Sequence, residues 1–298
     1  MSIADVIGTL DVANGVGEGP TWDERNGVLW WTDIPGHRVQ RLTLATLGIE
    51  RWTLRDFPAF TALTAAGGLI VGTRDVIVRF DPATGAATPL ARLEPERPDN
   101  RTNEGKVDPK GRLWVGTMQN NLNPDGSDRA MTASTGALYR IDADGRFSRQ
   151  LDGVGLSNTL AWSPDAATMY FGDSKANRIR RYRLDGGGAI VADADFHGEP
   201  PAGICDGSAI DAEGYLWNAR FGGGRLVRFA PDGRIDAEIA LPVRNPTSCA
   251  FGGADFRTLF VTSANYGLPA DMRGDARQGA LVILRTGVSG LPAARFAG

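Results

Sequence analysis

DPKGRLWVGT at residues 108–117 decides the fold, because the chain repeats its pattern. A polar turn containing proline and glycine leads into a short run of aromatic and β-branched residues, which is typical of a β-strand. The same order of turn and strand returns in DAEGYLWNAR at residues 211–220. The repetition, with little helical periodicity elsewhere, predicts an all-β chain.

Six strands of this kind can be aligned along the chain. They are VLWWTD, LIVGTR, RLWVGT, TMYFGD, YLWNAR and TLFVTS, starting at residues 28, 69, 112, 168, 215 and 258. A spacing of 41 to 56 residues is that of a four-stranded propeller blade. We therefore expect one domain over residues 1–298, a six-bladed β-propeller with four-stranded antiparallel blades around a central channel. The leading segment DVIGTLD, residues 5–11, is expected to supply the outer strand of the last blade and close the ring.

Composition narrows the function classes. The 298 residues are 42% hydrophobic and carry a net charge of -3, without long runs of one sign, which gives no reason to expect nucleic acid or a membrane as partner. The N-terminal residues show no signal-peptide pattern, so we expect a soluble cytoplasmic protein, monomeric or weakly dimeric. Two cysteines, Cys205 and Cys249, are expected to be reduced and packed. The chain has only two histidines, which argues against a zinc site with several histidine ligands and against a Ser-His-Asp triad.

Polar side chains recur at one register of the repeat, 11 or 12 residues before the central aromatic residue of the following strand. These side chains are Glu18, Asn103, Asn158 and Asp206. The register corresponds to the start of each innermost strand, so the four should ring one mouth of the channel. In repeat 6 the matching position is Thr247 or Ser248, and in repeat 2 the neighbourhood is Ala59 and Phe60. The ring is therefore expected to be polar over most of its circumference.

Two long loops should hang over the same mouth. Residues 119–135 and residues 264–278 each follow the second strand of a blade, whose end returns to the face where the innermost strand begins. Long loops on a rigid scaffold are common binding elements. We expect a pocket with a lid.

Two carboxylates and two carboxamides would be costly to bury together unless a positive charge compensated the carboxylates. All-oxygen ligands suit one divalent cation such as Ca²⁺, Mg²⁺ or Mn²⁺, with Zn²⁺ and Fe²⁺ left open. The alternative is that Asp, Asn and Gly simply form turns here, although their shared register argues against it. Arg101, two residues before Asn103, could bind a substrate oxygen or a developing oxyanion, or could be solvated surface.

Four motifs together resemble the gluconolactonase, regucalcin (senescence marker protein) and luciferin-regenerating-enzyme family. They are GEGPTWD (17–23), RTNEGKVDPKGRLWVGTM (101–118), GLSNTLAWSPD (155–165) and ICDGSAIDAEGYLW (204–217). The resemblance implies a six-bladed propeller with one divalent metal in its channel, and hydrolysis of sugar-acid lactones. It further implies metal ligation by Glu18, Asn158 and Asp206, and substrate contact by Arg101 and Asn103.

The chain also departs from that family pattern. Glu104 stands where an aspartate is usual, and Cys205 replaces a proline. Some members carry an acidic lid residue that touches substrate, whereas this chain has Gln119, Asn120 and Asn121, of which we assign Asn121 to substrate binding.

The resulting hypothesis is a metal-dependent lactonase that opens a sugar-acid lactone, with Asp206 as the catalytic residue that orients or deprotonates water. The alternatives are a metal-binding propeller without catalysis, and a hydrolase of organophosphates or other esters on the same fold.

Overall fold

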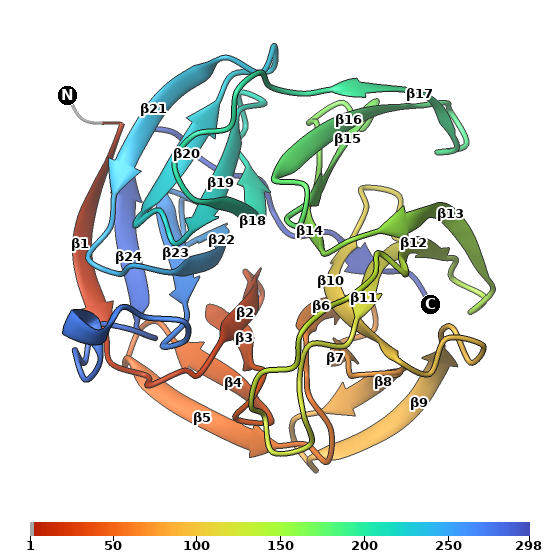
Figure 1. Ribbon diagram of the computed structural model, residues 1–298, viewed down its shortest axis with the longest axis horizontal. Helices are drawn as coiled ribbons and strands as arrows, with labels where there is room; N and C mark the ends of the chain where they lie inside the picture. The colour runs from red at the N-terminus through yellow and green to blue at the C-terminus, as the bar shows by residue number, and fades with distance from the viewer. Residues whose placement is uncertain (1–2) are drawn as a thin grey trace.

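The computed structural model describes residues 3–298, which form six β-sheets arranged as blades around one axis (Figure 1). The predicted six-bladed propeller is confirmed. The first three blades take the strands in chain order from the axis outward. Blade 1 contains β2 (Gly17–Asp23), β3 (Val28–Asp33), β4 (Arg38–Thr43) and β5 (Gly48–Thr53). Blade 2 contains β6 (Phe60–Thr64), β7 (Leu69–Gly72), β8 (Val76–Asp81) and β9 (Ala86–Arg92). Blade 3 contains β10 (Asn100–Val107), β11 (Leu113–Gln119), β12 (Gly136–Ile141) and β13 (Phe147–Val154).

The remaining blades follow the same order, except that the last one uses a strand from the start of the chain. Blade 4 contains β14 (Ser157–Trp162), β15 (Thr168–Asp173), β16 (Arg178–Leu184) and β17 (Ile190–Asp195). Blade 5 contains β18 (Ile204–Ile210), β19 (Leu216–Phe221), β20 (Arg225–Phe229) and β21 (Ile235–Ala240). Blade 6 contains β22 (Pro246–Gly252), β23 (Thr258–Ser263), β24 (Leu281–Thr286) and β1 (Ala4–Leu10).

Ring closure is antiparallel pairing of β1 with β24, as expected from residues 5–11. One feature was not foreseen. The short strand β25 (Arg295–Phe296) pairs in parallel with β6 and adds a fifth strand to the inner edge of blade 2. The chain after β24, the third strand of blade 6, thus returns to the inner edge of blade 2.

The core lies between neighbouring blades. Trp114 and Leu138 of blade 3, for example, pack with Leu160, Trp162 and Phe171 of blade 4. Inner strands are buried on both faces, whereas outer strands such as β9 and β17 are largely exposed and lie on the rim (Figure 1). The only helical element in the described chain is the 3₁₀ helix η1 (Ala270–Met272), so no helix among residues 3–298 is suited to crossing a membrane.

The repeated turn has a common physical cause in blades 3 and 5. The Asp108 carboxylate accepts hydrogen bonds from the backbone N–H of Lys110 (2.9 Å) and from Trp114 Nε1 (2.8 Å). Asp211 does the same for Trp217 Nε1 (2.9 Å). One carboxylate therefore fixes both the turn and the first large side chain of the next strand, which explains why the DxxGxLW pattern recurs.

Candidate active site

The sequence-predicted residues meet at one end of the channel, in a pocket of about 220 Å³. Six predicted side chains line it: Glu18, Arg101, Asn103, Asn121, Asn158 and Asp206. The volume is slightly below the range of roughly 300–1,000 Å³ that ligand pockets usually have, so the pocket suits a molecule of monosaccharide size. Strands β2, β10, β14 and β18 supply all but the lid residue Asn121.

The ring is completed differently in the other two blades. In blade 6, Thr247 is buried and its hydroxyl contacts Gly17 O and Thr262 Oγ1 instead of the pocket. In blade 2, Phe60 is fully buried. A Cβ added to Gly105 would lie 2.4 Å from the Phe60 ring, so glycine is required where this ring packs under the site.

A bulge at the start of the inner strands aims the polar side chains at the axis. Pairing with the second strand shifts register after Glu18, after Asn158 and after Cys205. A bulge turns a side chain out of the regular alternation and is common next to active sites. Gly19 follows Glu18 with a φ of 55°, and its absent Cβ makes room for the Phe60 backbone. This explains the second glycine of the motif GEGPTWD.

Three acids share one local geometry. Glu18, Glu104 and Asp206 are each followed by a glycine, and each carboxylate accepts the N–H of that glycine, at 3.1, 2.9 and 2.9 Å. Glu104 and Asp206 are buried, at 6% and 7% exposure. In the sequence, Glu104 stands out only because the family pattern usually has an aspartate at this position. The recurring acid-glycine pair was the signal that could have placed it beside the other two.

Burial raises the pKa of Glu18 to about 8, and the charge of Glu104 adds to this shift, while the Gly19 N–H and Arg101 oppose it. Burial likewise raises the pKa of Asp206 well above its usual value, with contributions from the charges of Glu18 and Glu104. The two carboxyl groups crowd together, and Arg101 offsets only part of the rise in the pKa of Glu18. Among residues 3–298, neither Glu18 nor Asp206 forms an ion pair with a lysine or arginine.

Asn158 is oriented by its neighbours. Its Nδ2 donates to Ser174 Oγ at 2.8 Å, and Ser174 in turn donates to the carbonyl of Cys205. This leaves Asn158 Oδ1 facing Asn103 Nδ2 at 3.4 Å. The amide oxygen therefore joins the two carboxylates as a third oxygen donor in the pocket.

These oxygens fit a hard divalent cation. Two carboxylates and an oriented amide oxygen are ligands that Ca²⁺, Mg²⁺ and Mn²⁺ prefer, and the crowding of the acids gives a physical reason for a cation between them. Within the described residues no three His, Cys, Asp or Glu side chains are grouped as metal ligands. A metal site here therefore depends on the amide of Asn158.

Arg101 is held in place by the lid. Its Nε and Nη2 both donate to Asn121 Oδ1, at 3.0 and 2.9 Å, and Nη1 donates to the Thr102 carbonyl. Three of the five guanidinium N–H groups are thus occupied, and two stay available. Burial lowers the pKa of Arg101 to about 10, which still leaves it charged at neutral pH.

Both predicted loops contribute to the pocket. Asn121, Leu122 and Gly126 come from the loop 119–135, and Tyr266 comes from the loop 264–278. Burial raises the pKa of Tyr266, as does its contact with Asp128 of the first loop, so the two loops touch above the site. Sequence reasoning missed Tyr266, because nothing in the loop marks which residue turns inward.

The cysteines are structural, as expected. Cys205 lines the pocket and Cys249 lies in the core, and both are buried free thiols. Burial raises the pKa of each thiol to about 12, so neither is an activated nucleophile.

Residues 16–265 match the family described as SMP-30/Gluconolactonase/LRE-like region. The chain is 35% identical over 286 residues to 6-deoxy-6-sulfogluconolactonase of Pseudomonas putida, covering 95% of each chain. It is 34% identical over 292 residues to L-arabinolactonase of Azospirillum brasilense, covering 97% of this chain and 94% of the relative. A crystal structure of the calcium-binding protein regucalcin from Agrobacterium tumefaciens superposes with a TM-score of 0.90 at 31% identity, over 98% of both chains. The chain therefore belongs to the SMP-30/gluconolactonase/LRE-like family.

Proposed function

We propose that the protein is a metal-dependent lactonase that hydrolyses the ester ring of a sugar-acid lactone. One observation carries the proposal: two crowded carboxylates and an oriented amide oxygen share a monosaccharide-sized pocket with a buried arginine. The names of the two enzyme relatives support the substrate class, since both denote lactones of sugar acids.

Glu18, Asn158 and Asp206 would hold the cation. Glu18 Oε2 and Asp206 Oδ1 accept glycine N–H groups, so Glu18 Oε1 and Asp206 Oδ2 would face the cation. Asn158 Oδ1 would join them, although it also lies 3.4 Å from Asn103 Nδ2. A bound divalent cation would polarise the lactone carbonyl and make water more acidic. The ion could be Ca²⁺, Mn²⁺, Zn²⁺, Mg²⁺ or Fe²⁺.

Substrate is oriented by three polar side chains. Arg101 offers two N–H groups to the carbonyl or ring oxygen. Asn103 donates its amide to Ser157 O at 2.8 Å and has Oδ1 available to accept from a sugar hydroxyl. Asn121, fixed through Oδ1, has its Nδ2 available to donate. Together they hold the ester carbon in one orientation toward Asp206.

The proton moves through Asp206. Its carboxylate accepts a proton from water as the water oxygen bonds to the carbonyl carbon, and Arg101 balances the oxyanion that develops. The carbon–oxygen ring bond then breaks, and Asp206 returns the proton to the departing alkoxide. The product is an open-chain hydroxy acid, which ionises in water, so atoms and charge balance.

The test is a lactone panel assayed after chelation and after re-addition of single cations. We expect hydrolysis to stop on chelation and to return with at least one of the five ions. Thermal unfolding should shift at the same time, because a cation at ~100 times its dissociation constant stabilises the fold by about 2.7 kcal/mol. A phosphotriester serves as comparison substrate.

Asp206→Asn separates the two roles of that residue. It keeps an oxygen ligand but removes the proton acceptor, so turnover should fall by about 10²–10⁴-fold while cation binding is weakened and still measurable by calorimetry. Asp255→Asn, on an exposed pair with Arg285, is the matched control and should leave turnover unchanged. Cation binding without turnover of any lactone would indicate a non-catalytic metal protein, and preferred hydrolysis of the phosphotriester would indicate the other ester class.

A further inference from the structure

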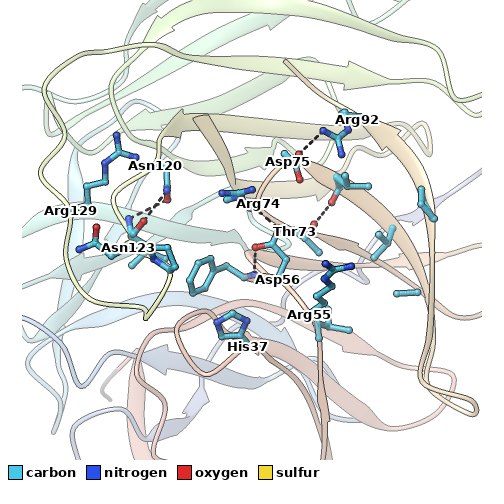
Figure 2. A pocket seen from close by; sticks show the side chains of 18 residues that line it. His37, Arg55, Asp56, Thr73, Arg74, Asp75, Arg92, Asn120, Asn123 and Arg129 are labelled. Atoms are coloured by element: carbon cyan, nitrogen blue, oxygen red, sulfur yellow. Dashed lines mark hydrogen bonds and ion pairs between the residues drawn. The ribbon is translucent and has the colours of Figure 1, made fainter. Parts of the chain in front are cut away.

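A second cavity of about 1000 Å³ is lined by part of the lid and by segments of blades 1 and 2 (Figure 2). The connection between blades 1 and 2, the hairpin between β7 and β8, and strand β9 form its walls, and residues 120–129 of the lid close it. We call this cavity the lid groove. Leu122 is the single residue that lines both the lid groove and the central pocket. The two cavities therefore lie on opposite sides of the same loop.

The walls of the lid groove carry excess positive charge, although the whole chain is negative. Four arginines line it against two aspartates. They are Arg55, Arg74, Arg92 and Arg129, against Asp56 and Asp75. The floor between them is apolar and includes Leu54, Phe57, Val78 and Leu122. Such a surface suits a molecule that combines an anionic group with a carbon body.

The arginines differ in how far their charge is already satisfied. Arg92 pairs with Asp75 at 2.8 Å, and Arg129 pairs with Asp99. Arg74 reaches Asp56 only at 3.7 Å, and Asp56 already accepts the N–H of Phe57. Arg55 forms no hydrogen bond or ion pair with any of the described residues. Figure 2 shows Arg55 and Arg74 on neighbouring walls of the groove, with Asp56 between them. These two guanidinium groups are the ones that a ligand could use.

The lid groove is tied to the central pocket by hydrogen bonds. The Arg129 N–H donates to the carbonyl of Asn121 at 2.8 Å, and the side chain of Asn121 holds Arg101. On the other wall, the Thr102 N–H donates to the carbonyl of Arg74 at 2.8 Å. A molecule held between these walls would therefore steady the loop that positions Arg101.

We propose that the lid groove is a binding site for a small oxyanion, carboxylate or phosphate, held by Arg55 and Arg74 with any carbon body on the apolar floor. Guanidinium groups bind both oxyanions through charge-assisted hydrogen bonds. The site is separate from the proposed catalytic pocket and does not depend on the proposed hydrolysis.

The experiment measures binding to the full chain by calorimetry, with inorganic phosphate and gluconate as separate probes and glucitol as the neutral comparison. We expect at least one anion to bind and glucitol not to bind, with affinity decreasing as salt rises to about 0.15 M. The variant Arg55→Gln/Arg74→Gln should weaken anion binding by about tenfold or more, since each charge-assisted hydrogen bond is worth about that factor. Both side chains can be replaced without unfolding, because Arg55 has no partner to lose among residues 3–298 and the pair of Arg74 is exposed.

Arg146→Gln is the matched control, because Arg146 is an exposed arginine of blade 3 that does not line the groove. It should bind like the unmodified protein. Hydrogen exchange should show protection by the bound anion at residues 54–57 and 120–129. Phosphate binding alone identifies a bare oxyanion site, and stronger gluconate binding identifies an organic acid site. Absence of binding by both anions, equal binding by the double variant, or protection confined to other residues would overturn the proposal.

Discussion

Thr159 shows how one residue can set the position of the catalytic candidate. It follows Asn158 with a φ of 44°, in the same place where Gly19 follows Glu18. A β-branched residue is strained in this region of φ, so other contacts must hold it. The Thr159 hydroxyl donates to the Asp206 carbonyl at 2.5 Å and lies 3.1 Å from Ser208 Oγ. Blade 4 thereby holds the backbone of Asp206 in blade 5.

Thr159→Val should lower the free energy of unfolding by about 1–2 kcal/mol, because it keeps the shape and removes the hydroxyl that satisfies buried partners. Cation affinity should fall as well, since the Asp206 backbone loses a contact. Urea denaturation and calorimetry with the cation measure the two effects. Thr159→Ser keeps the hydroxyl and is the matched control. Unchanged stability and affinity in the valine variant would contradict this role.

At the residue scale, the register of the repeat predicted which side chains line one pocket. Glu18, Asn158 and Asp206 lie at equivalent strand starts, so their convergence follows from rotational repetition. The contacts of the loops could not be predicted in this way. That Asn121 binds Arg101, and that Tyr266 faces inward, depends on how two irregular segments pack on each other.

At the scale of an element, the aspartate of the repeated turn does more than form the turn. Asp211 is fully buried and pairs with Arg228, which also contacts Glu213 and Asp236 and lies 3.6 Å above the Tyr215 ring. The same carboxylate accepts from Trp217 Nε1. One short sequence motif therefore anchors the turn, the tryptophan and the next strand of blade 5.

Asp211→Ala should reduce the free energy of unfolding by about 3–5 kcal/mol, because it leaves a buried arginine without its buried partner and the Trp217 N–H unsatisfied. Thermal and urea unfolding measure this. The control is Glu238→Ala, which breaks the exposed pair with Arg225 and should cost about 0–1 kcal/mol. Equal losses in the two variants would show that the motif acts only as a surface turn.

Elements were predictable where they repeat and unpredictable where they occur once. Strands such as β11 and β19 follow from a turn signal and an apolar run. β25 does not, because its two residues show no periodicity and it forms only where β6 offers a free inner edge. The bulges were also hidden, since one extra residue in a strand leaves little trace in its composition.

At the scale of the whole molecule, blade 6 joins the two ends of the ring. β1 pairs along β24 from Ala4 with Thr286 to Leu10 with Leu281, with a shift between Val6 and Gly8. Without this pairing β24 would be an exposed edge strand, rich in apolar residues. The leading segment could be assigned from the sequence because the last repeat lacks a fourth strand of its own.

Removal of residues 1–10 should leave the edge of β24 open. We expect a lower unfolding temperature and aggregation that increases with protein concentration, measured by light scattering during heating. Restoring the strand as a separate peptide should recover part of the stability, whereas a peptide with the same composition in scrambled order should not. A soluble and equally stable shortened protein would contradict a closing role for β1.

The same pairing sets an order for synthesis on the ribosome. Residues 4–10 are synthesised about 270 residues before their partner strand, residues 281–286. At about 5–20 residues per second, the first strand waits tens of seconds before the ring can close. Blades 1 to 5 are complete in sequence before β24 is made, whereas blade 6 can pair its rim strand β1 only afterwards. The nascent chain therefore cannot close the ring until residues 281–286 have been synthesised, and β1 stays without its partner strand during that interval.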